Sequence, residues 1–215
     1  ACTAKVPVED TQTSSNGTNE TNTQAAASST GDMTLRVTCP TTPETCDPAR
    51  GTGENDRLLY VNVYECLVKP NEKDGSPEPA LAESWEAADD GLTYTFKLRS
   101  DVCFADGTAM TAEDVKYSLD RMIALGQGYA YILSDVLEST EAADEHTVVF
   151  HLKKCFGPFV SSMTCFRILN SKLMKENTVS DGSYGENGDY GTTFLLTNTA
   201  GSGPYYVSSF TVHDN

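Results

Sequence analysis

PALAESWEAADDGLTYTFKLRSDVCFADGTAMTAEDVKYSLDR, residues 79–121, is the stretch that decides the fold. Its residues 92–98 alternate between apolar and polar, which is the two-residue period of a half-buried strand. Asp89-Asp90-Gly91 comes immediately before them as a turn, because Gly takes positive φ without steric cost. A first strand near Trp85 should therefore pair with the second strand as a hairpin.

The same stretch ends in a helix that begins at a capping box. The Thr111 hydroxyl can accept a hydrogen bond from the Asp114 amide, and the Asp114 carboxylate can accept one from the Thr111 amide. Apolar residues then recur at the three- and four-residue spacing of one helical face. Gly126 is a typical stop. The sequence therefore predicts a helix over residues 110–125.

Shorter patterns of periodicity and turn residues predict the remaining elements. They are a strand from Leu35 to Cys39, a helix over 56–68, a hairpin of strands 136–141 and 147–153, a short helix after Gly157-Pro158, a short strand over 166–169, a helix over 172–176 capped by Ser171, a long surface loop over 178–193 and a strand over 205–212.

Composition excludes several classes of protein. The 215 residues suffice for one or two domains. They carry 15 Lys and Arg against 31 Asp and Glu, a net charge of −16 that would repel a nucleic-acid backbone. No C-x-x-C, H-E-x-x-H or G-x-S-x-G motif occurs, so the sequence predicts neither a metal site nor a catalytic nucleophile. We expect no enzyme activity and no cofactor.

Seven cysteines remain to be explained: Cys2, Cys39, Cys46, Cys66, Cys103, Cys155 and Cys165. Without Cys2 their number is even, which permits disulfides in an oxidising compartment. Closeness in sequence favours the pairs Cys39–Cys46 and Cys155–Cys165. Alternatively, several of them are small buried apolar residues.

Residues 1–31 read as a tether. They are rich in Ser, Thr, Asn and Ala, with almost nothing large to bury, and such a segment cannot offset its ordering entropy. Ala1-Cys2 at its head resembles the end of a bacterial lipobox, where a small residue precedes the Cys that becomes lipidated. We therefore expect a lipid anchor at Cys2. The alternative is a stray cysteine in a linker.

Three ordered motifs carry a resemblance to a known family. They are P-x-L-A-E-S-W-E at 79–86, D-D-G-L-T-Y-T-F-x-L-R at 89–99 and F-x-D-G-T-x-x-T-A-E-D-V-x-Y-S-L-x-R at 104–121. The chain thus resembles the extracytoplasmic solute-binding proteins of family 5, the oligopeptide-, dipeptide- and nickel-binding components of ABC importers. Residues 201–205 are similar to the family's G-T-G-P-Y, whereas Cys66 stands where the family usually has Gly. The resemblance covers residues 35–210. Family members are much longer, so the chain looks like an N-terminal part of one.

The resemblance implies a fold and a function. The fold would be α/β, part of a two-lobed periplasmic-binding-protein-like (type II) fold. Residues 32–56 and 199–215 would belong to the first lobe and 57–198 to an attached α+β subdomain, with the second lobe absent. The protein would be a monomeric lipoprotein on the outer face of the bacterial cytoplasmic membrane, or in the periplasm. It would capture a small solute there and deliver it to an ABC permease.

Tyr129 and Tyr131 are the candidate ligand-binding residues. Both lie on a Gly-rich connection after the helix that ends near Gly126, and an aromatic there can reach the ligand cleft in the resembling family. The alternative is that they only pack the loop. An oligopeptide is the favoured solute, with nickel complexes or oligosaccharides next. Rival functions are a surface-anchored interaction module without transport and a secreted hydrolase, which lacks the nucleophile–base pair it would need.

Overall fold

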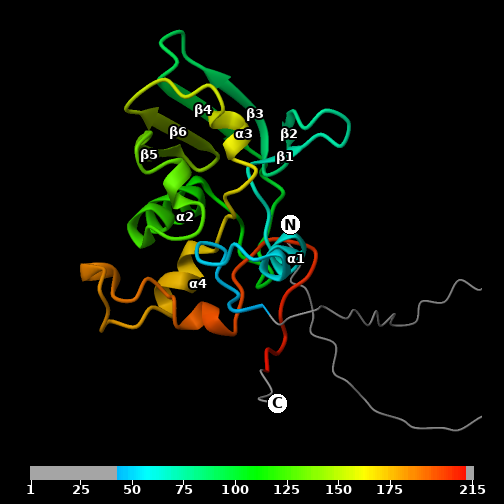
Figure 1. Ribbon diagram of the computed structural model, residues 1–215, viewed down its shortest axis with the longest axis vertical. Coiled ribbons are helices and arrows are strands. Elements are labelled where there is room, and N and C mark those ends of the chain that lie inside the picture. Colours follow the sequence, from blue (N-terminus) through cyan, green and yellow to red (C-terminus); the bar gives the residue numbers. More distant parts are fainter. Residues whose placement is uncertain (1–42, 212–215) are drawn as a thin grey trace, which may run out of the picture.

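A four-stranded antiparallel sheet forms one end of the molecule, and two helices pack on one of its faces (Figure 1). The computed structural model describes residues 43–211. The strand order is β3-β4-β6-β5. The strands and helices of this part are β3 Ala82–Ala87, β4 Thr93–Leu98, α2 Ala112–Leu125, β5 Leu137–Asp144, β6 Thr147–Leu152 and α3 Phe159–Ser162.

Alternation along the strands builds the core of this part. Tyr94, Phe96 and Leu98 of β4 are buried, as the sequence predicts. Phe96 lies opposite Val148 of β6 in the register. Its ring meets Phe150 edge-on, with 5.3 Å between centroids. Aromatic pairs across neighbouring strands add to the stability that burial supplies.

The predicted hairpins and the central helix are confirmed. Gly91 turns the first hairpin at φ 65°, and Gly126 ends α2 at φ 63°. At the start of α2, the Asp114 carboxylate accepts hydrogen bonds from the backbone N–H of Thr111 at 2.8 Å and from its hydroxyl. It also accepts from the backbone N–H of Ser171 at 2.8 Å, so the cap joins α2 to α4.

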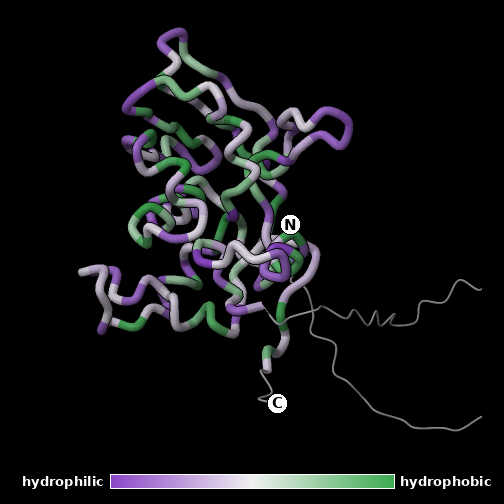
Figure 2. Tube along the Cα trace, viewed as in Figure 1, coloured by the Kyte–Doolittle hydropathy of each residue, from purple (hydrophilic) through white to green (hydrophobic). Residues whose placement is uncertain are grey.

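The other end of the molecule collects segments that are far apart in the sequence. α1 (Glu54–Val63) and α4 (Ser171–Glu176) lie here with the loop after Thr45 and the last described residues (Figure 1). A small hairpin, β1 Val68–Pro70 and β2 Pro77–Pro79, projects from the region between the two ends of the molecule and ends in a hydrophilic tip (Figure 2). Between residues 43 and 211 the chain also forms three short 3-10 helices: η1 Ala130–Ile132, η2 Gly185–Asn187 and η3 Phe194–Leu196.

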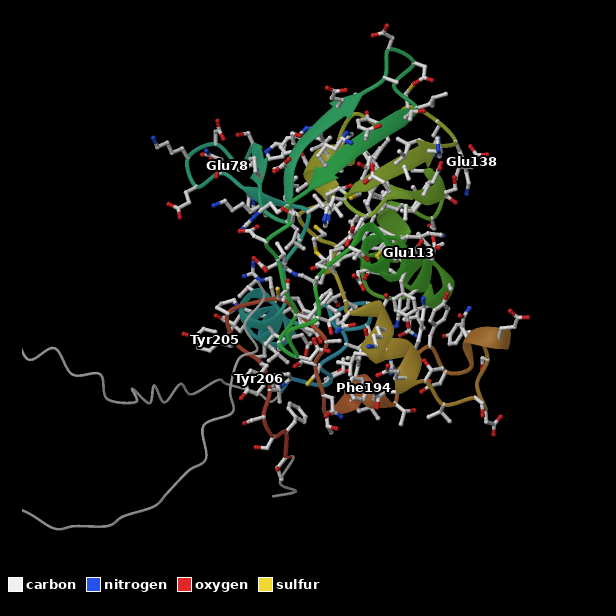
Figure 3. The ribbon with its side chains drawn as sticks, turned by 180° about the vertical axis from the view of Figure 1, so that it is seen from behind. Glu78, Glu113, Glu138, Phe194, Tyr205 and Tyr206 are labelled. Carbon is white, nitrogen blue, oxygen red and sulfur yellow. The ribbon has the colours of Figure 1, made fainter. Side chains whose placement is uncertain are left out.

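The predicted helix over 56–68 is too long, because α1 ends at Val63. Its last carbonyls are taken by the returning chain: Gly203 N–H donates to Val63 O at 2.9 Å, and Tyr205 N–H donates to Asn62 O at 3.1 Å. Tyr205 accordingly lies beside α1 (Figure 3). A distant segment thus terminates the helix, which no local pattern could indicate.

Three smaller predictions are also wrong. Residues 205–211 form no strand: the N–H of Tyr205 donates to Asn62 O of α1, and that of Val207 to the Thr199 hydroxyl. Residues 166–169 contribute only an isolated bridge, between Arg167 and Cys66. Asn170, not Ser171, caps α4, because its side-chain oxygen accepts from the N–H of Leu173 at 3.0 Å.

The segment 178–193 is a loop, as expected, but one aspartate organises it. The Asp189 carboxylate accepts from the backbone N–H groups of Val179, Gly191 and Thr193 at 2.8–2.9 Å. Burial by itself would raise the pKa of Asp189. The hydrogen bonds outweigh burial, and the pKa of this carboxyl is lowered.

The favoured disulfide pairs do not form. Cys46, Cys155 and Cys165 are free thiols, so neither Cys39–Cys46 nor Cys155–Cys165 exists in this structure. Cys155 lies by the first hairpin turn, with its Sγ 3.4 Å from Asp90 O, whereas Cys165 lines the groove described below. Closeness in sequence therefore did not bring the sulfurs together.

The expectation of at least one disulfide is confirmed at Cys103, which is disulfide-bonded. Cys2, Cys39, the tether over 1–31 and the strand from Leu35 lie outside the described residues. Between residues 43 and 211, no helix is long and apolar enough to cross a membrane.

Candidate solute-binding groove

A groove of about 500 Å³ opens where the two ends of the molecule meet. Its walls come from four parts of the chain: the loop after Pro48, one side of α1, the segment that enters and forms β1, and the segment after α3. Tyr129 and Ala80 add to the lining. The lining residues are Pro48, Gly51, Thr52, Gly53, Arg57, Tyr60, Val61, Tyr64, Glu65, Cys66, Val68, Lys69, Pro70, Ala80, Tyr129, Thr164, Cys165 and Arg167.

Two tyrosines of α1 and its C-cap hold the loop against the helix. The Tyr60 hydroxyl donates to Asp47 O at 2.8 Å and lies 3.1 Å from Thr45 O, and the Tyr64 hydroxyl donates to Cys46 O at 2.7 Å. Burial, and then the neighbouring acidic groups, raise the pKa of Tyr60 far above its ordinary value. Both hydroxyls therefore stay protonated and keep donating at physiological pH.

A buried ion pair anchors the same loop to α2. Asp47 and Arg121 have fully buried side chains and form a bidentate pair, with N–O distances of 2.9 and 2.6 Å. The Arg121 Nε–H also donates to Tyr190 O at 2.7 Å, and Asp47 accepts from the N–H of Ala49 at 3.0 Å. Planar guanidinium and carboxylate groups match in this geometry, so the pair sets where the groove-lining loop lies.

Tyr129 reaches the groove because Gly128 allows close backbone approach. A Cβ on Gly128 would lie 2.6 Å from Ala49 O, and φ of Gly128 is +55°. Arg50 Nε–H also donates to the Gln127 side chain at 3.0 Å. The Gly-rich connection is thus fastened to the loop after Asp47, and half-buried Tyr129 lines the groove.

Tyr131 is not brought to the same place. Its side chain is 72% exposed, and it does not line the groove. Of the two tyrosines indicated by the sequence, the structure therefore brings only Tyr129 to the groove.

Sequence reasoning missed the positive charge of the groove. Arg57, Lys69 and Arg167 line it together with a single acidic residue, Glu65. Lys69 also pairs with Glu78, at 3.9 Å. The lining side chains thus carry more positive than negative charge, in a chain whose net charge is −16. Arg167 is the only charged residue between positions 155 and 171, and that isolation was the available signal.

Arg167 is held by a sulfur. Its Nη1–H donates to Cys66 Sγ at 3.0 Å, and the two residues face each other across the isolated antiparallel bridge. Burial raises the pKa of Cys66 to about 12, and the Arg167 guanidinium opposes that rise. Among the described residues, no cluster of three or more His, Cys, Asp or Glu side chains could hold a metal ion.

The sequence comparison supplies the family. The family described as bacterial extracellular solute-binding proteins, family 5 (middle), matches residues 76–215. The chain belongs to this family. Among family 5 relatives, the probable D,D-dipeptide-binding periplasmic protein of Escherichia coli is 38% identical over 174 residues, covering 78% of this chain and 32% of the relative. The di/tripeptide-binding protein 2 of Pseudomonas aeruginosa is 34% identical, covering 65% of this chain and 30% of the relative.

Solved structures confirm the α/β fold as part of a type II periplasmic binding protein. DppA from Helicobacter pylori, in complex with peptide STSA, superposes with a TM-score of 0.64 at 25% identity, covering 80% of this chain and 35% of that one. NikZ from Campylobacter jejuni, in complex with Ni(L-His), has a TM-score of 0.64 at 26% identity, with coverages of 77% and 31%. The chain thus spans about a third of the length of these family 5 relatives.

Proposed function

We propose that this chain is part of the solute-binding component of an ABC importer, that it captures a peptide outside the cytoplasmic membrane, and that the groove forms one wall of the binding site. The groove carries this proposal: it has the volume of a small-ligand site, and aromatic and cationic side chains line it. Relatives that bind dipeptides and tripeptides belong to the same family.

Peptides suit this wall for electrostatic reasons. A free peptide carries a terminal carboxylate, and arginine binds carboxylates through two parallel N–H donors. Arg167 is half-buried, so its charge is screened less than that of a fully exposed side chain. The same reasoning admits nickel complexes of carboxylate-bearing chelators, and it favours uncharged oligosaccharides least.

Binding measurements on the full-length protein test the proposal. Calorimetry against dipeptides, tripeptides, a nickel–histidine complex and an oligosaccharide should give the tightest binding for a peptide. Tyr129→Ala should weaken that binding by about five- to tenfold, because a ring in contact with a solute contributes about 1–1.4 kcal/mol. Tyr131→Ala is the matched control and should change little. A larger loss from Tyr131→Ala than from Tyr129→Ala would overturn the assignment.

We further propose the lipid anchor at Cys2, and both this anchor and transport need separate measurements. For the anchor, mass spectrometry of the native protein should find a diacylglyceryl group on Cys2; an unmodified Cys2 would refute it. For transport, uptake of the bound peptide should require the protein. Tight binding without uptake would favour the interaction module, and cleavage of the peptide would favour the hydrolase. The lobe boundaries, at residues 56–57 and 198–199, remain predictions.

A further inference from the structure

Two thiols share one wall of the groove. The antiparallel bridge sets Cys66 opposite Arg167. Cys165 lies two residues before Arg167, at the end of the turns that follow α3, where its N–H donates to Ser162 O at 3.0 Å. Cys66, Cys165 and Arg167 all line the groove.

Contacts bring the two sulfurs into one neighbourhood. The Cys66 thiol donates to Thr164 O at 3.1 Å, and that carbonyl belongs to the peptide bond leading into Cys165. The Thr164 hydroxyl lies 3.9 Å from Cys165 Sγ. Cys66 is buried, whereas Cys165 is partly exposed. The pair thus consists of one accessible thiol with a shielded thiol beside it.

We propose that Cys66 and Cys165 are a redox-active thiol pair, which closes to a disulfide by exchange with a low-molecular-weight disulfide. The Cys165 thiolate attacks the small disulfide, forms a mixed disulfide and releases one thiolate. The Cys66 thiolate then attacks Cys165 Sγ and releases the second. One small disulfide is reduced to two thiols, two protein thiols are oxidised, and the protons lost by the protein end on the released thiolates.

The surroundings assign the order of the two steps. Exchange needs access, and Cys165 is the more exposed thiol, so it reacts first. Burial outweighs the Arg167 guanidinium at 3.0 Å, so Cys66 stays protonated in the resting protein and is shielded from external disulfides. Once Cys165 carries a mixed disulfide, Cys66 loses its proton as it attacks, and the adjacent guanidinium stabilises the thiolate in that step.

Peptide mapping of the full-length protein tests this pair. The reduced protein is incubated with glutathione disulfide, free thiols are alkylated, and the digest is analysed by mass spectrometry. The expected result is a linked peptide pair containing Cys66 and Cys165, lighter than the two free peptides by two hydrogen atoms. In the protein without substitutions, either of two results after incubation with glutathione disulfide would overturn the proposal. One is full alkylation of both thiols, and the other is a mixed disulfide that persists on Cys165.

Variants separate the two roles. Cys66→Gly, which installs the residue usual in the family, should leave a persistent glutathione adduct on Cys165. Cys165→Ala should leave Cys66 unmodified. Cys155→Ala removes an exposed thiol elsewhere and should not change the linked pair. Rapid modification of Cys66 in Cys165→Ala would contradict the assigned order.

A last arm rests on the proposed function. Saturating peptide should slow formation of the linked pair, because Cys165 lies in the groove. If the pair forms but a peptide known to bind does not slow it, the proposed solute wall is contradicted while the thiol pair stands. If neither Cys66 nor Cys165 reacts in the peptide-free protein, although the peptide binds in a separate measurement, the thiol-pair proposal fails and the solute-site proposal stands.

Discussion

Replacing Arg121 with Met should lower the stability of this protein more than a substitution of similar size on its surface. The side chains of Arg121 and Asp47 are both fully buried, and the guanidinium binds both carboxylate oxygens. Met fills much of the same volume but leaves the Asp47 carboxylate buried without its counter-charge. The substitution also removes the hydrogen bond from Arg121 to Tyr190 O.

The magnitude follows from the cost of an unpaired buried charge. Removing one partner of a buried ion pair costs about 3–5 kcal/mol. In a protein of this size each kcal/mol lowers the melting midpoint by about 2–4 °C, so the midpoint should fall by about 6–20 °C. Lys116→Met is the matched control, because Lys116 pairs with Asp120 on the surface of α2. Exposed pairs at this helical spacing contribute only about 0.3–0.5 kcal/mol.

Thermal and urea unfolding followed by circular dichroism will measure both variants. The double variant Asp47→Asn, Arg121→Met gives a sharper test, since Asn keeps an acceptor for the Ala49 N–H but carries no charge. It should be more stable than Arg121→Met alone. The reasoning is refuted if Arg121→Met costs no more than Lys116→Met, or if the double variant is the least stable of the three.

Three further outcomes are expected. Gly203→Ala should destabilise the protein by about 1–3 kcal/mol in urea unfolding, because the new Cβ would lie 2.6 Å from the Val63 carbonyl carbon. Gly157→Ala is the control: a Cβ there has no atom within 4 Å, so the free energy of unfolding should change by no more than about 0.5 kcal/mol. Equal effects of the two variants would contradict this packing. The lowered pKa of Asp189 means that its contribution to stability is complete above about pH 4 and is lost as the pH falls through the lowered value. Asp189→Asn should therefore flatten the acid side of the stability profile, and an unchanged profile would disprove that contribution. In calorimetry, residues 1–215 alone should bind peptide at least about tenfold more weakly than the full-length protein, since one wall buries too little of a flexible ligand; equal affinity would count against a two-walled site.

Local sequence determined the sheet and the central helix. Strand alternation in residues 92–98, the turn at Gly91 and the cap at Thr111 are signals that need only a few neighbouring residues, and the structure reproduces all of them. The family was readable from the same stretch, because its motifs lie in this locally encoded part. Tyr129 was indicated by its place on a Gly-rich connection and by the family resemblance; the structure brings it to the groove, and its role in binding stays a prediction.

Tertiary structure alone decided the groove, the end of α1 and the fate of the cysteines. The groove joins residues near 50 to residues near 165, so no window of sequence contains it. α1 stops at Val63 because the chain near Gly203 takes its last carbonyls. Cys165 lies beside Cys66, 99 positions away, and not beside Cys155, because a bridge at Arg167 sets the register. Such pairings depend on packing between distant segments, so the local pattern of residues cannot predict them.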